Sequence, residues 1–177
     1  MNFLELVKSR YAVRAYQTEK VEQEKLTQIL EAGRMAPTGG NLQPQRLIVV
    51  QEADGLLKLA KAANIYHAPL AIIVCTDTEK TWIRPQDGKR LTDIDASIIT
   101  DHMMLQATEL GLASVWVCWF DAKILREEFQ LPATWEPVNI LVLGYPAEPP
   151  KPAAAHDSMR KPLQETVFDE NLNRLVL

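Results

Sequence analysis

Two arginines, Arg10 and Arg14, stand four residues apart in the run 9–14 (SRYAVR), just beyond the N-terminal segment. A guanidinium group presents a rigid fork of N–H donors that matches the oxygens of a phosphate. A second basic pair, Arg160 and Lys161, occurs near the C-terminus and could complete the same site. Each pair taken alone is also explained by solvated charges or by a cation near the end of a helix. An anion site is therefore one of two interpretations at this point.

A second candidate site is the segment 36–45 (APTGGNLQPQ). Pro37 disfavours helical geometry at the residue before it, and the glycines tolerate backbone angles that other residues avoid, so the segment is predicted to be a loop. Asn41 and Gln43 each carry a hydrogen-bond donor and an acceptor. With exposed backbone N–H groups beside them, they suit a flat heterocycle that alternates donors and acceptors. An ordinary helix-to-strand connection is the alternative.

Two shorter motifs follow, 111–117 (GLASVWV) and 144–146 (GYP). Taken alone, each is explained equally well as the start or the end of a buried strand. Their value lies in their order along the chain, after the two candidate sites.

The apolar spacing predicts the elements that must position these motifs. A helix from Asn2 to about Arg10 precedes the arginines, and Gly111 is expected to end the central buried helix. Asp121 is expected to cap the helix that follows. Helices and strands are interleaved, which favours a sandwich with helices covering a sheet. The predicted helices are 2–10, 21–35, 54–63, 92–110 and 121–129, and the predicted strands are 46–51, 70–75, 113–120 and 138–145.

Two segments lack clear periodicity. The stretch 76–90 is predicted to be a long loop, and its Trp82 and Arg84 are candidates either for a lid over a substrate or for ordinary surface packing. Beyond the proline-rich spacer 147–152, a polar tail extends to residue 177. Because it contains few apolar residues, the tail is expected to stay loose or to lie against another surface.

Composition limits the function classes. The 177 residues fit a single domain, and a net charge of −4 argues against nucleic-acid binding. The N-terminus does not resemble a secretory signal, and no apolar run approaches the length of about 20 residues that spans a bilayer. Cys75 and Cys118 each lie in an apolar run and are expected to be buried free thiols of a cytoplasmic protein.

Several familiar motifs are absent from the sequence. It contains no P-loop, no GxGxxG after a strand, no HExxH, no CxxC and no GxSxG. Its three histidines are scattered, so no metal site is expected.

The order of the remaining motifs resembles the nitroreductase family of flavoproteins. Members of that family typically carry S/T-R-x-S-x-R, A-P-S-x-x-N-x-Q-P-W, G-L-G-x-x-W, G-Y-P and R-K-P-L in this order, and the match extends from Ser9 to about Leu163. Two positions depart from the pattern. Ala12 stands where a serine often contacts the phosphate, and Gln45 replaces the tryptophan that usually follows Gln-Pro.

The resemblance implies an α+β, nitroreductase-like, three-layer α/β/α sandwich, with a central mixed, mostly antiparallel sheet flanked by helices. It also implies an intertwined homodimer with FMN bound between the subunits, in which residues 1–177 form one domain and the tail 163–177 wraps the partner. The cofactor-binding residues implied by position are Arg10, Tyr11, Ala12, Arg14, Pro37, Thr38, Gly39, Asn41, Gln43, Val115, Trp116, Val117, Arg160 and Lys161.

The activity implied is an FMN-dependent oxidoreductase, which takes hydride from NAD(P)H and then reduces an electron-poor small molecule such as a nitroaromatic or a quinone. No catalytic side chain is identified, since the flavin carries the chemistry. Three alternatives remain: another flavin reaction, such as reductive dehalogenation or flavin fragmentation; a non-catalytic flavin-binding module; and an α+β binding protein without flavin.

Overall fold

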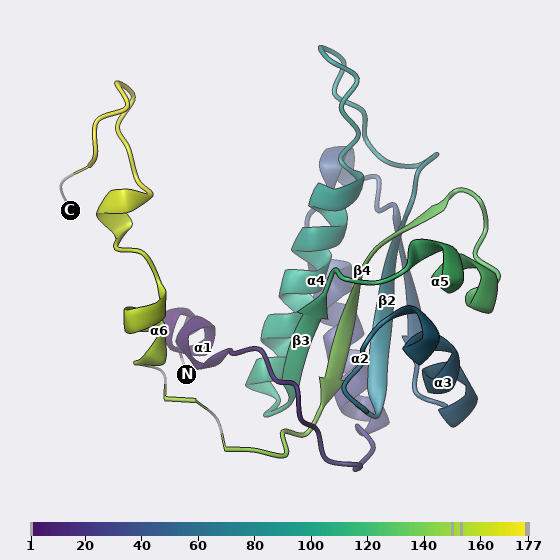
Figure 1. The fold of residues 1–177 in the computed structure, drawn as a ribbon. Helices are drawn as coiled ribbons and strands as arrows, with labels where there is room; N and C mark the ends of the chain where they lie inside the picture. The colour runs from purple at the N-terminus through teal and green to yellow at the C-terminus, as the bar shows by residue number, and fades with distance from the viewer. Residues whose placement is uncertain (1, 150, 153, 176–177) are drawn as a thin grey trace.

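A computed structural model describes residues 2–149, 151–152 and 154–175 (Figure 1). The strands and helices alternate along the chain, as the apolar spacing predicts. The strands are β1 (Gln45–Val50), β2 (Leu70–Asp77), β3 (Ala113–Val117) and β4 (Trp135–Gly144). The helices are α1 (Phe3–Ser9), α2 (Gln23–Met35), α3 (Ala53–Ala62), α4 (Thr92–Glu109), α5 (Ala122–Phe129) and α6 (Ala155–Met159), with short 3-10 turns η1 (Gly39–Asn41) and η2 (Leu163–Glu165).

The strands form a sheet in the order β1-β2-β4-β3, and each neighbouring pair is antiparallel. A parallel bridge between Ala12 and Ser114 adds the mixed character to the outer edge of β3. Every residue of β2 is buried, which explains its almost continuous apolar sequence. The register between β2 and β4 shifts at Val74, where Pro137 enters β4. Such a bulge accommodates a residue that has no N–H to donate.

Helices cover both faces of the sheet. On one face, Ile72 and Leu141 pack with residues of α2 and α4, and on the other face, Ile73 and Ile140 pack with residues of α3 and α5. Figure 1 shows the sheet between these helix pairs. The predicted α+β sandwich of three layers is therefore confirmed.

Helix α4 is the central helix that the sequence predicts, but its buried residues, from Asp95 to Ala107, recur at helical spacing on one side of the helix. Gly111 follows it with φ +77°, and its N–H donates to the carbonyl of Thr108. A glycine adopts this left-handed conformation without the cost of a Cβ clash. The predicted Asp121 cap is confirmed, because its side chain accepts hydrogen bonds from two N–H groups of α5, and Asn2 forms a capping box with Glu5 at the start of α1.

Helices α1 and α6, which come from near the two ends of the chain, lie next to each other beside the sandwich. The His156 ring of α6 lies 2.9 Å (Nε2 to O) from the backbone carbonyl of Arg10. Beyond α6, the yellow tail in Figure 1 continues away from the body. It contains a bridge between Phe168 and Arg174, and its backbone hydrogen bonds join residues of 162–175 to one another. The last two residues of the predicted tail, 176 and 177, lie outside the described part of the chain.

Several boundaries differ from expectation. Thr76 and Asp77 belong to β2 rather than to the loop, and a bridge between Ile83 and Arg90 folds the rest of 76–90 back on itself. Strand β3 ends at Val117 instead of continuing to residue 120. The prediction that Cys118 is buried is therefore wrong, because the chain has left the sheet and its side chain is exposed. Cys75 is buried, as expected. Among the described residues, no helix is long and apolar enough to cross a membrane.

Gly144, at the end of β4, allows close packing against two rings. A Cβ at this position would lie 2.8 Å from Cδ of Pro69 and 3.0 Å from Cδ1 of Tyr16. Because neither ring can bend away, we expect Gly144→Ala to lower the free energy of unfolding by about 1–3 kcal/mol, measured by urea titration. Gly55→Ala is the control, since its Cβ in α3 would meet only a Val50 methyl group. A Gly144→Ala midpoint equal to that of the control would contradict this packing argument.

Candidate functional site

Basic side chains from both ends of the chain line one pocket between α1 and α6, with a volume of about 200 Å³. Arg10 and Arg14 come from the segment after α1, and Arg160 comes from the end of α6. The remaining lining residues are Lys8, Ser9, Tyr11, Ala12, Lys151, Pro152, Ala155, His156 and Met159. The structure thus brings together five of the predicted site residues: Arg10, Tyr11, Ala12, Arg14 and Arg160.

The electrostatics of this pocket favour an anion. Burial lowers the pKa of Arg10 below its usual value, the neighbouring Arg160 lowers it further, and Asp101 acts in the opposite direction. Arg10 therefore carries its charge in a partly desolvated place beside another cation. An anion placed between the two guanidinium groups would remove this repulsion, and it would receive charge-assisted hydrogen bonds.

Lys161 lies apart from this pocket. It lines a neighbouring hollow of about 780 Å³, together with Arg10, Arg160 and apolar residues such as Leu4 and Leu163. Three titratable residues of the first pocket are not among the site residues that the sequence predicts: Lys8, Lys151 and His156. Lys8 precedes the arginine motif by one residue. Lys151 and His156 join the site only because α6 packs against α1, and no local sequence pattern predicts that contact.

The outer edge of β3 lies next to the basic pocket. The carbonyl of Ser114 accepts a hydrogen bond from the N–H of Val13, on the side away from β4. Because backbone groups of successive strand residues point to opposite sides, the N–H and C=O of Trp116 face the same outer edge. The side chains of Val115 and Val117 are buried in the core and that of Trp116 is partly buried, so this predicted segment would meet a ligand mainly through its backbone groups.

A larger hollow of about 700 Å³ opens at the end of β3. Trp119 lines it and is 92% exposed, an unusual state for a residue of this size. Tyr66 forms part of the same wall, and the Arg14 guanidinium lies 5.9 Å from the centre of its ring. The basic pocket and this hollow thus meet at the contact between Arg14 and Tyr66. Its other lining residues are Ala60, Lys61, Ala62, Ala63, Asn64, Val117, Phe120 and Asp121.

Residues 37–43 of the predicted loop 36–45 lie away from the basic pocket. Gly39 is hydrogen-bonded to Asp95 in the first turn of α4, whereas Arg10 shares a hollow with Thr108 near the end of that helix. Thirteen residues of α-helix separate these two points by about 20 Å. One subunit therefore does not bring Pro37, Thr38, Gly39, Asn41 and Gln43 to the basic pocket.

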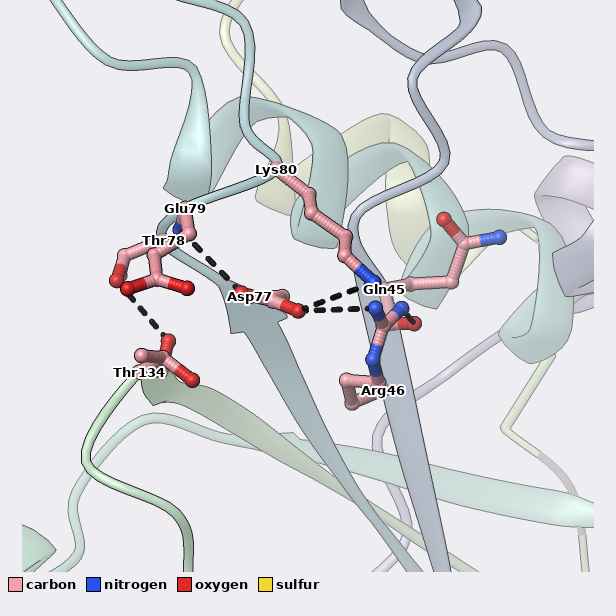
Figure 2. Close-up of polar contacts among 7 residues, drawn as sticks. All are labelled: Gln45, Arg46, Asp77, Thr78, Glu79, Lys80 and Thr134. Atoms are coloured by element: carbon pink, nitrogen blue, oxygen red, sulfur yellow. Dashed lines mark hydrogen bonds and ion pairs between the residues drawn. The ribbon is translucent and has the colours of Figure 1, made fainter.

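A partly buried ion pair anchors the end of this loop (Figure 2). The Asp77 carboxylate lies 2.9 Å from the Arg46 guanidinium and 3.8 Å from the Lys80 ammonium group. The Asp77 N–H also donates to the carbonyl of Pro44, at 2.8 Å (N to O). These contacts fix the point where the loop 37–43 enters β1.

The two cysteines should differ sharply in reactivity. Burial raises the pKa of the Cys75 thiol to about 12, whereas Cys118 is exposed. Since the thiolate is the nucleophile, we expect iodoacetamide at pH 8 to alkylate Cys118 and to leave Cys75 intact in the native protein. The intact mass should show one adduct on the native protein and two on the denatured protein. The native Cys118→Ser variant should show none. A native adduct on Cys75 would contradict its burial.

Comparisons with known proteins match the chain to one family. The model of the nitroreductase family matches residues 7–65 and 54–145. The crystal structure of a nitroreductase family protein from Clostridium difficile 630 is 63% identical in sequence, with a TM-score of 0.94, and the match covers 96% of this chain and 99% of that one.

Two further relatives carry functional names. A Methanothermobacter thermautotrophicus protein, provisionally named NADH dehydrogenase/NAD(P)H nitroreductase, is 32% identical over 163 residues, which cover 85% of this chain and 80% of that protein. A Bacteroides fragilis nitroreductase crystallised with bound FMN is 25% identical, with a TM-score of 0.70, and the match covers 86% of this chain and 92% of that one. The sequence motifs, the three-layer fold and the family match agree, and the chain belongs to the nitroreductase family.

Proposed function

We propose that this protein is a cytoplasmic, FMN-dependent oxidoreductase that takes hydride from NAD(P)H and reduces an electron-poor small molecule such as a nitroaromatic or a quinone. The observation that carries the proposal is the basic pocket, which leads along the outer edge of β3 to a larger hollow. The bound FMN of one relative and the NAD(P)H in the name of another support the choice of cofactor and reductant.

The residues present fit FMN in both of its parts. Arg10, Arg14 and Arg160, with Lys8 and Lys151, supply cationic hydrogen-bond donors of the kind that bind a phosphate dianion. Within β3, the residues from Ser114 to Val117 span about 10 Å along the strand direction, so a ligand anchored at the pocket would extend along β3 toward the larger hollow. The backbone N–H and C=O of Trp116 would meet the polar edge of the ring system. Asn64 and Tyr66 of the larger hollow would border it.

When bound, the flavin supplies the chemistry of hydride acceptance and donation. The protein holds the phosphate, orients the ring and offers fixed N–H donors, which stabilise negative charge without reorganising. We assign no side chain as a general acid or base.

We further propose that two copies of the chain complete each site. The loop 37–43 and the basic pocket lie about 20 Å apart within one subunit, so the loop would approach the FMN of the partner. Residues 1–177 would form one domain, with the tail 163–177 wrapped around the partner. The tail exposes large apolar side chains, including Leu163 at 61% and Leu172 at 82%. Such exposure is costly for a segment that stays in water.

The test is made on the purified protein. It should show the absorbance of oxidised flavin, release FMN on denaturation, and oxidise NADH or NADPH when a quinone or a nitroaromatic is added. Product analysis then distinguishes reduction of the acceptor from fragmentation of the flavin. A protein that stays colourless after reconstitution with FMN would overturn the proposal, and one that binds FMN without oxidising either nucleotide would reduce it to a binding module.

A further inference from the structure

Asp95 is a buried acidic residue that the proposed function does not use. It lies in the first turn of α4 and is 1% exposed. Its Oδ1 atom accepts a hydrogen bond from the backbone N–H of Gly39 at 2.9 Å. Its Oδ2 atom is buried and has no hydrogen-bond partner among the described residues. A half-satisfied carboxyl group in the interior is costly, so its presence calls for a specific role.

The residue that Asp95 holds is tightly enclosed. A Cβ on Gly39 would lie 2.8 Å from a methyl carbon of Leu91 and 2.9 Å from Cβ of Trp82. The backbone at Gly39 is therefore pressed between the start of α4 and the 82–91 segment. Only a glycine allows this approach, and the bond to Asp95 fixes how deeply the loop sits.

The loop beyond Gly39 has a conformation that needs support. Gly40, Asn41 and Gln43 have φ values of +57°, +55° and +50°. The two residues that carry a Cβ adopt a left-handed conformation that is uncommon for residues other than glycine, so the surrounding contacts must hold it in place. Within the loop, Thr38 Oγ1 accepts a hydrogen bond from the Gln43 N–H at 3.1 Å. The hydrogen bond from the Gly39 N–H to Asp95 connects the loop to α4.

We propose that Asp95 is a positioning residue. By holding Gly39, it keeps the segment 38–43 in the shape that contacts FMN, and so it raises FMN affinity without touching the cofactor. This inference rests on the proposed function for its effect on FMN, whereas its effect on the loop can be measured without any ligand.

A neighbouring acidic residue provides the matched control. Asp93 lies in the same first turn of α4 and is exposed. Both residues place negative charge near the helix N-terminus, where it is favourable. Asp93→Asn therefore removes the same charge but leaves the bond to Gly39 intact. Asp95→Asn keeps an oxygen that can accept from Gly39, and Asp95→Ala keeps none.

The experiment combines two measurements on the full chain. The first is hydrogen–deuterium exchange of peptides covering 38–43 in the FMN-free protein, with peptides of β2 as the internal reference. The second is the Kd for FMN, measured by quenching of flavin fluorescence. For Asp95→Ala we expect faster exchange in 38–43, unchanged exchange in β2 and about a tenfold or greater rise in Kd. Asp95→Asn should recover most of the affinity, and Asp93→Asn should match the original protein.

Each outcome decides the inference. The inference would be overturned if the Asp95→Ala variant exchanged hydrogen in 38–43 at the rate of the original protein. It would also be overturned if the variant exchanged faster but bound FMN with the Kd of the original protein. If Asp95→Ala lacks a cooperative thermal transition, Asp95→Ser makes the same comparison, because its hydroxyl is too short to reach Gly39. If the original protein binds no FMN, the proposed function fails, and the exchange measurement still shows whether Asp95 holds the loop.

Discussion

Replacing Arg10 and Arg14 together by alanine is expected to raise the Kd for FMN by at least about 100-fold. Both guanidinium groups line the basic pocket, and each hydrogen bond from a charged donor contributes roughly 1.5–3 kcal/mol. The loss should appear as a colourless preparation and in fluorescence titrations with added FMN. Riboflavin, which lacks the phosphate, should bind equally poorly to the variant and to the original protein.

Two controls separate charge from geometry. Arg34→Ala removes an exposed arginine that is paired with Glu31 on α2, and it should leave the FMN Kd unchanged. Replacing Arg10 and Arg14 by lysine keeps both charges but removes the planar fork, so an intermediate affinity is expected. Undiminished retention of FMN by the double alanine variant would remove the phosphate assignment.

Removing residues 163–177 is expected to convert the protein into a monomer that no longer retains FMN. The described part of this tail forms its backbone hydrogen bonds within 162–175, so the sandwich should fold without it. Its exposed Leu163 and Leu172 would lose their proposed partner surface. Sedimentation velocity gives the mass of the species in solution, and the thermal transition reports on the remaining fold.

A point variant tests the same surface without changing chain length. Leu163→Glu places a charge on an exposed apolar position of the tail and should also weaken association. Leu57→Glu is the control, because Leu57 on α3 is comparably exposed, at 67%. A truncated protein with an unchanged sedimentation coefficient would show that the tail does not hold two subunits together.

Local sequence patterns predicted most of the fold. The apolar run 70–75 suits a strand buried on both faces, and Gly111 marks the end of α4 because a left-handed residue is needed there. The sequence predicts that β4 starts at Val138, whereas the strand starts at Trp135 and includes Pro137, a residue that strand interiors normally exclude. A bulge opposite Val74 accommodates that proline, and a bulge depends on the neighbouring strand rather than on the local sequence.

The basic site was predicted only in part for a similar reason. Arg10 and Arg14 form a local motif, but Lys151 and His156 join them through a contact between segments nearly the whole chain apart. The burial of Asp95 was equally hidden, because a charged residue in a first helical turn is usually solvated. Cys118 was misplaced because its apolar neighbours continue beyond the last paired residue of β3.

The short outer edge of β3 has a consequence for handling the protein. A strand with exposed backbone donors and acceptors is a template on which the strand of another molecule can add, and this begins cross-β aggregation. Beyond the Ala12 bridge, the described part of the chain leaves the Trp116 backbone groups open on that side. We therefore expect that riboflavin supplied during expression will raise the soluble yield, and that protein stripped of ligand will precipitate first.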